Sequence, residues 1–164
     1  MQLIFVSLGL QDYQISMESE SAMANRAADI VFLLDITGSM QPCIDALQRN
    51  IATFIDFLSA DDANNEMPVK DWRGKVVGYR DVNYDGDDWY EDNDFVRDAD
   101  ALKAQVNAMK AKGGGDEPES LLDAIYRVGA LEAVDRGFQE DDPRRWRHRR
   151  DAARVIVIFT DASY

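Results

Sequence analysis

The segment Ile30-Val-Phe-Leu-Leu-Asp-Ile-Thr-Gly-Ser39 decides the fold class of this chain. Its first five residues form an unbroken apolar run rich in β-formers, which is typical of a parallel strand buried on both faces. Asp35 ends that run. A second run, Val155-Ile-Val-Ile-Phe159, is followed by Thr160 and Asp161. Two predicted core strands therefore each deliver an aspartate at their carboxyl end.

Apolar spacing between these two strands predicts the rest of the fold. Residues 44–58 repeat apolar side chains every three or four positions, with Ser39 as the expected N-cap and Pro42 in the first turn. The other predicted elements are one strand and two helices, at residues 75–82, residues 95–109 and the segment after Pro118. This order predicts an α/β fold with a doubly wound, Rossmann-like, mostly parallel sheet flanked by helices. In such a sheet, ligands bind beyond the carboxyl ends of the strands.

The 164 residues are enough for one domain, which we assign to residues 28–164, preceded by an N-terminal extension at residues 1–27. Residues 1–10 are apolar but lack a basic start and are too short to span a bilayer, so we interpret them as non-targeting. This reading and the lack of paired cysteines favour the cytoplasm. A secreted origin is the alternative if translation starts later, at Met17 or Met23.

Charge and composition exclude several classes of function. The formal net charge of −13 disfavours nucleic acid and anionic membranes as partners, because carboxylates repel both. Cys43 and His148 are the only cysteine and histidine, so multi-cysteine zinc sites and hydrolase triads lack their residues. Any metal must therefore be held by oxygen atoms.

The turn after the first core strand carries such oxygens. Asp35, Thr37 and Ser39 alternate along it, which points one carboxylate and two hydroxyls in the same direction. A hard cation such as Mg²⁺ accepts these donors while keeping several waters. The alternative is a purely structural turn in which Ser39 caps the following helix, and on this motif alone the two readings have equal weight.

Two further segments favour the metal reading. Gly113-Gly-Gly-Asp-Glu-Pro-Glu119 is a glycine-rich stretch that leads into a predicted helix and presents Asp116 and Glu119. Asp161 follows the last predicted strand. Because carboxyl ends of parallel strands meet at one edge of a sheet, the three segments are expected to converge there.

The order D-x-T-x-S, then G-G-G-D-x-P-E, then strand-T-D resembles the metal-ion-dependent adhesion site (MIDAS) of von Willebrand factor A (vWA) domains. The likeness covers roughly residues 28–164, and the second loop is similar to those of integrin β-like and bacterial members. The resemblance implies a Mg²⁺ site, with Mn²⁺ able to substitute. The implied ligands are Asp35, Thr37, Ser39, Glu119 and Asp161, with direct or water-mediated contact by Asp161 left open, and Asp116 supports the loop.

The resemblance also implies how the site works. One coordination position stays open, and an aspartate or glutamate of a partner protein completes it without bond chemistry. The chain is thus expected to be a Mg²⁺-dependent protein-binding module and not an enzyme. An adjacent regulatory ion is not expected, because Gln41-Pro-Cys43 stands where integrin β-like members carry two aspartates.

Two alternatives stay open at the level of sequence. Asp35 could instead be the nucleophile of a Mg²⁺-dependent phosphotransfer enzyme resembling haloacid dehalogenases, although Thr37 stands where that family has its acidic general acid. The chain could also be an incomplete product, since vWA domains usually continue after the fourth core strand. In that case one edge of the strand at residues 155–159 would be exposed and solubility would be low.

Charged segments elsewhere give weaker predictions. Residues 81–92 partly match a calcium loop, with Ca²⁺ ligands expected at Asp81, Asn83, Asp85 and Asp92, although Asp88 occupies a position that is normally apolar. Residues 81–100 are rich in acids and residues 144–150 in arginine, and both are interpreted mainly as solvated loops.

Overall fold

A computed structural model describes residues 2–7, 27–59, 69, 71–115, 120–137 and 142–161. The chain forms a mixed five-stranded sheet in the order β1-β5-β2-β3-β4. The five strands are β1 Gln2–Ser7, β2 Ala27–Asp35, β3 Asp71–Tyr79, β4 Tyr90–Glu91 and β5 Ala153–Thr160. The central strands β5, β2 and β3 are parallel, whereas β1 and β4 pair antiparallel at the two edges. The α/β class and the mostly parallel sheet are thus confirmed.

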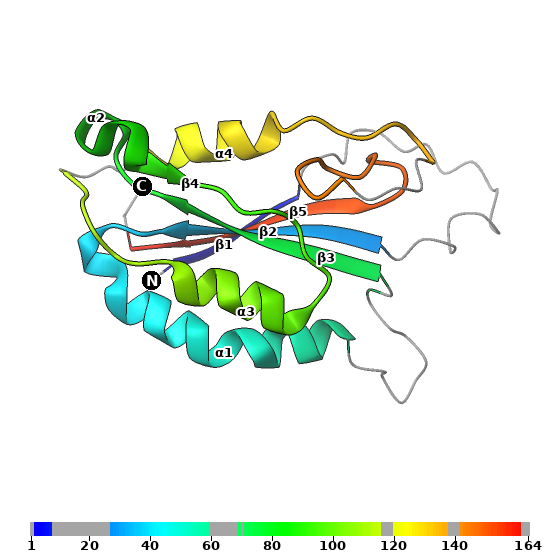
Figure 1. Cartoon of the computed structure of the whole chain (residues 1–164), viewed down its shortest axis with the longest axis horizontal. Coiled ribbons are helices and arrows are strands. Elements are labelled where there is room, and N and C mark those ends of the chain that lie inside the picture. Colours follow the sequence, from blue (N-terminus) through cyan, green and yellow to red (C-terminus); the bar gives the residue numbers. More distant parts are fainter. Residues whose placement is uncertain are drawn as a thin grey trace.

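Helices cover both faces of the sheet (Figure 1). The helical elements are η1 Gly38–Met40, α1 Gln41–Ser59, α2 Val82–Asp85, η2 Gly86–Trp89, α3 Ala99–Ala108 and α4 Leu121–Gly129. Helices α1 and α3 lie on one face and α4 lies on the other (Figure 1). Among the described residues, no helix is both long and apolar enough to cross a membrane.

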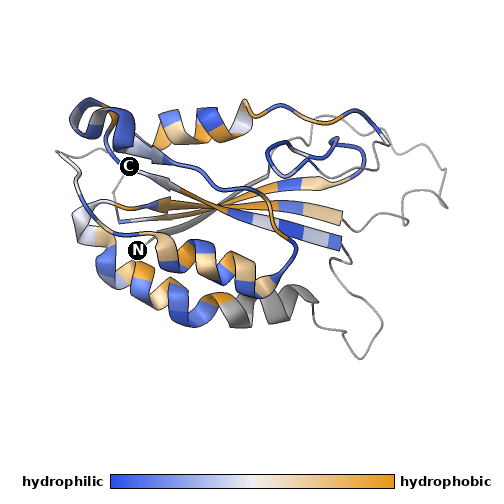
Figure 2. Ribbon diagram, in the orientation of Figure 1, coloured by the Kyte–Doolittle hydropathy of each residue, from blue (hydrophilic) through white to orange (hydrophobic). Residues whose placement is uncertain are grey.

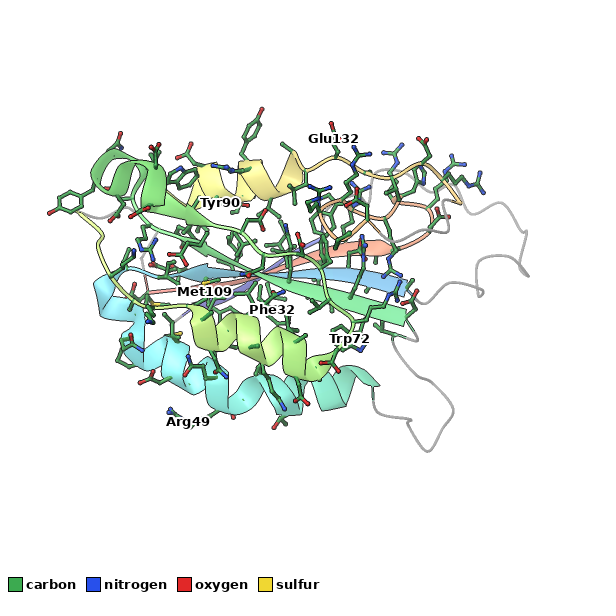
Figure 3. All side chains as sticks on the ribbon, viewed as in Figure 1. Phe32, Arg49, Trp72, Tyr90, Met109 and Glu132 are labelled. Atoms are coloured by element: carbon green, nitrogen blue, oxygen red, sulfur yellow. The ribbon has the colours of Figure 1, made fainter. Side chains whose placement is uncertain are left out.

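Alternate residues of β2 supply the two halves of the core. Phe32 packs with Met109 on the side of α1 and α3, and both are labelled in Figure 3. Val31 and Leu33 face the opposite side, where they pack with Trp146 beneath α4. A strand that is buried on both faces explains the unbroken apolar run seen in the sequence and the apolar centre of the sheet in Figure 2.

Several element boundaries differ from the sequence expectation. Helix α3 begins at Ala99 and not near residue 95, because the Asp98 carboxylate accepts a hydrogen bond from the amide of Ala101 and caps the helix there. Strand β3 ends at Tyr79, since Asp81 caps α2 in the same way. Ser39 lies inside the turn η1 and is not the cap of α1.

The edge of β5 is not exposed as predicted. Residues 2–7, which were assigned to an N-terminal extension, form β1 and pair with β5 along its length, from Gln2 opposite Thr160 to Ser7 opposite Val155. The sheet therefore includes part of that extension.

A cluster of ion pairs fixes the amino end of the sheet. Asp29 is fully buried, and the guanidinium of Arg73 donates to both of its oxygens at 2.8 and 2.9 Å. Arg147 adds bonds from its backbone amide and its Nε, both at 2.7 Å, and also pairs with Asp71. The basic segment 144–150 is therefore only partly a solvated loop, because Arg147 anchors it to β2 and β3.

Candidate functional site

Asp35 lies at the carboxyl end of β2 and is fully buried. Its Oδ1 accepts bonds from the backbone amide and the hydroxyl of Thr37, at 3.0 and 2.6 Å, and its Oδ2 accepts from the Thr160 hydroxyl at 3.3 Å. Burial raises the pKa of Asp35, and the bonds from Thr37 offset this only in part. Among the described residues, no lysine or arginine pairs with this carboxylate.

Thr37 and Ser39 form the hydroxyl part of the site. Thr37 is 2% exposed, and its Oγ1 lies 3.5 Å from the Oγ of the exposed Ser39. Because the Thr37 proton is directed to Asp35 in the short 2.6 Å bond, Oγ1 can act only as an acceptor toward Ser39, and one of its two lone pairs remains for another partner. The alternation expected from the sequence therefore places all three side chains in one chain of contacts.

The glycine-rich segment lies directly against this turn. The carbonyl of Gly113 accepts a bond from the amide of Gly38 at 3.2 Å. Gly114 has φ +85°, and a Cβ built there would lie 2.8 Å from Cγ2 and 2.9 Å from Cβ of Thr37. Only glycine fits such an approach together with that backbone conformation. The sequence prediction that these two segments converge is borne out for Gly113 and Gly114.

Of the other predicted ligands, only Asp161 lies in the described part of the chain. It is exposed directly after β5, and its charge contributes to the raised pKa of Asp35, so the two carboxylates are close. Asp116 and Glu119 fall outside the described residues. Within the described part, no group of three or more histidine, cysteine, aspartate or glutamate side chains forms a metal cluster.

The acidic segment 81–92 does not run as one open loop. It turns through α2 and η2, with Asp81 capping α2 and Asn83 exposed. The Oδ2 of Asp85 accepts bonds from the amides of Asp81 and Gly114, at 3.3 and 3.0 Å, so this carboxylate supports the glycine-rich segment. Asp92 instead pairs with the buried Lys75 at 2.7 Å. Calcium binding here stays a prediction.

Two residues beside the site were not singled out from the sequence. Thr160 donates to Asp35, and its position just before Asp161 was the available signal. Arg80 is fully buried directly after β3 and donates to the carbonyls of Lys112, just before the glycine-rich segment, and of Asp88 in η2. No motif marked it, because its partners are mainly backbone carbonyls.

Comparison with known proteins does not extend this description. The chain matches no protein-family model and no curated protein significantly.

Proposed function

We propose that this chain is a vWA-like domain that holds Mg²⁺ at the carboxyl edge of the sheet and binds an acidic side chain of a partner protein. The observation that carries the proposal is the state of Asp35. This carboxylate is buried among hydroxyl and amide donors, with a second carboxylate nearby and no cationic partner in the described chain. Buried charges are normally paired or bound to metal.

The donor set fits a hard divalent cation. Thr37, Ser39, Asp35 and Asp161 offer only oxygen atoms, which Mg²⁺ prefers. Thr37 could bind the ion through a lone pair of its hydroxyl while it keeps its proton and donates it to Asp35, a bond that increases the electron density on Oγ1. By the resemblance to vWA domains, Glu119 is a further ligand and Asp116 supports its loop.

The chain's own residues would set selectivity for the partner. A bound divalent ion that is only partly neutralised favours an anionic oxygen over water at its remaining position. The exposed Ser39 and Asp161 border that position, whereas Asp35 stays beneath the surface. A partner aspartate or glutamate would therefore approach over Ser39.

Binding, and not phosphotransfer, is the better proposal for Asp35. A nucleophilic carboxylate must reach the reacting phosphorus atom, yet Asp35 has no exposed surface and both oxygens accept hydrogen bonds. The burial that disfavours attack suits a residue that carries charge beneath a metal.

The ion site is tested first by calorimetric titration of Mg²⁺ and Mn²⁺ into chelator-stripped protein. We expect one saturable site that Asp35→Asn and Asp161→Asn weaken at least tenfold. Asp135→Asn is the matched control, because it removes one equal charge at an exposed position with no tie to the site. A wild-type protein that binds neither ion contradicts the proposal, as does equal weakening in the control.

The partner position is tested separately with Mn²⁺-loaded protein. Acetate, as the smallest carboxylate probe, should displace water from the ion and lower the water-proton relaxation enhancement. Acetamide, which is neutral and of similar size, should not. An unchanged signal with acetate would show that no open position exists for a partner carboxylate.

A further inference from the structure

Arg80 connects two chain segments that border the candidate site. It follows β3 directly, and its guanidinium is fully buried. On one side, Nε donates to the carbonyl of Lys112 at 3.0 Å and Nη2 to that of Lys110 at 3.5 Å. On the other side, Nη1 donates to the carbonyl of Asp88, and Nη2 to the carboxylate of Glu91 at 2.6 Å. One side chain thus joins residues 110–112 to residues 88–91.

The first of these segments leads straight to the site. Lys112, whose carbonyl Arg80 holds, also donates its amide to the carbonyl of Ile36 at 3.0 Å. The next two residues, Gly113 and Gly114, contact Gly38 and Thr37. Figure 1 shows this loop running from the end of α3 back to the edge where α2 lies. A shift of residues 110–112 would therefore reach Thr37 within two residues.

The second segment supports the same loop from the other side. Residues 82–89 form α2 and η2, and the carboxylate of Asp85 in α2 accepts a hydrogen bond from the amide of Gly114. Arg80 fixes the end of this segment through Asp88 and Glu91, and its own amide donates to the carbonyl of Trp89 at 2.7 Å. The guanidinium of Arg80 therefore bonds directly to the residues before the glycine-rich segment and to the end of the segment that carries Asp85.

A second buried arginine, Arg73 within β3, shows what a purely structural role looks like. Arg73 makes a two-bond pair with the buried Asp29 and donates to the carbonyls of Asp142 and Arg145. It lies at the amino end of the sheet, away from Asp35. Arg80 has no buried carboxylate partner of this kind, since Glu91 is 40% exposed. Most of its donors hold loop carbonyls in place.

We propose that Arg80 is a positioning residue that holds Gly113 and Gly114 against Thr37 and thereby sets the affinity of the Mg²⁺ site. The inference rests on the proposed function, because it concerns the same site. Arginine suits this task, since its planar fork can satisfy several carbonyls at fixed angles, whereas a lysine ammonium cannot replace that geometry.

The test compares Arg80→Lys with Arg73→Lys in the full chain. Each variant keeps the charge and removes a buried guanidinium, one within β3 and one directly after it, so both should lose stability in chemical unfolding. We expect Mg²⁺ affinity to fall by about 10- to 100-fold in Arg80→Lys, as it does when groups that orient metal ligands are removed, and by less than twofold in Arg73→Lys. Metal affinity compared at similar stability loss is a readout that a purely structural role would not move.

A second pair of variants, with smaller expected effects on stability, tests the same inference if Arg80→Lys does not fold. Glu91→Gln weakens one support of Arg80, and Asp92→Asn is its matched control, because the neighbouring carboxylate is 36% exposed and pairs with Lys75 instead. We expect a loss of Mg²⁺ affinity of about threefold in the first and none in the second.

The outcomes separate the two proposals. Wild-type affinity retained in Arg80→Lys or, if that variant is unfolded, in Glu91→Gln would overturn the role of Arg80 alone. Equal weakening in a variant and its matched control would also overturn it, because the effect would then be general. A wild-type chain that binds no Mg²⁺ would overturn both this inference and the proposed function.

Discussion

Strand β2 carries a fully buried aspartate at each end, and the two are treated in opposite ways. Asp29, at the amino end, is neutralised by Arg73 and Arg147. Burial alone would raise the pKa of Asp29, but the bonds and charges of these arginines hold it below its usual value. Asp35, six residues on, has only hydroxyl and amide donors among the residues that the structure describes, and its pKa is raised. The chain completes the first site by itself and leaves the second in need of positive charge.

This difference separates structure from function along a single strand. A self-neutralised carboxylate holds neighbouring segments together, as Asp29 does for β3 and the arginine-rich segment. A buried carboxylate without a counter-charge lowers stability unless it binds something. Under the proposed function, the bound Mg²⁺ would supply the missing positive charge at Asp35, so substitutions at the two ends of β2 should have opposite effects on stability.

The largest effect is expected at the amino end. Asp29→Asn leaves the buried Arg73 without a counter-charge, and removal of one partner of a buried pair costs about 3–5 kcal/mol of unfolding free energy. Denaturant unfolding measures the loss. Asp71→Asn is the control: Asp71 is 45% exposed, so its pair with Arg147 should contribute less than about 1 kcal/mol. Equal losses in the two variants would mean that burial of Asp29 is not what matters.

A smaller effect is expected where the glycine-rich segment meets Thr37. Gly114→Ala should cost about 1–3 kcal/mol, because the added methyl group overlaps Thr37 at a positive φ. Gly137→Ala serves as the control, since Gly137 has φ +72° but no atom within 4 Å of the new Cβ. Only Gly114→Ala should also weaken Mg²⁺ binding in calorimetry. Identical stability losses would show that Thr37 is not tightly packed.

The smallest effect has the opposite sign. Asp35→Asn should raise the unfolding free energy at neutral pH, in the presence of chelator, by about 0.5–2 kcal/mol, the usual gain when a functional site is relieved. Asparagine fits, because its Oδ1 still accepts from Thr37 and the Thr160 hydroxyl can turn to accept from its Nδ2. A loss of stability would contradict the view that Asp35 lacks a counter-charge.

The pH dependence of this gain follows from the raised pKa. Asp35 binds its proton more tightly in the folded state than in the unfolded state, where its pKa is near 3.8. The ionised carboxylate therefore destabilises the metal-free fold above its raised pKa. As the pH falls below that value, Asp35 becomes neutral in the fold while it is still ionised in the unfolded chain, so the advantage of Asp35→Asn should shrink steadily and disappear near pH 3.8. Unfolding curves of both proteins over this pH range, in chelator, measure the change.

Sequence reasoning succeeded where local pattern and topology coincide. The apolar runs before Asp35 and Thr160 predicted the parallel core strands, and the parallel order alone predicted that the aspartates would meet. The same order predicted that the glycine-rich segment would lie beside the turn after β2, which the contacts of Gly113 with Gly38 and of Gly114 with Thr37 confirm. These features depend on strand direction and residue size, both of which can be read from sequence.

Sequence reasoning failed where a residue's role depends on a partner that is distant in the sequence. Nothing near Asp29 in the sequence indicates Arg147, which lies 118 positions away in a segment that looks solvated. Arg80 likewise bonds mainly to carbonyls, which carry no side-chain signal. The calcium-loop pattern matched oxygen spacing but gave no indication that Lys75 would pair with Asp92.

The pairing of β1 with β5 also affects the order in which the strands of the sheet form. Gln2 opposes Thr160, so β1 leaves the ribosome long before β5 and must wait for it before the two strands can pair. At about 5–20 residues per second, synthesis of the intervening chain takes on the order of ten seconds. Contacts of such high order are slow to form, so β1 should be the last strand to gain hydrogen-exchange protection during refolding.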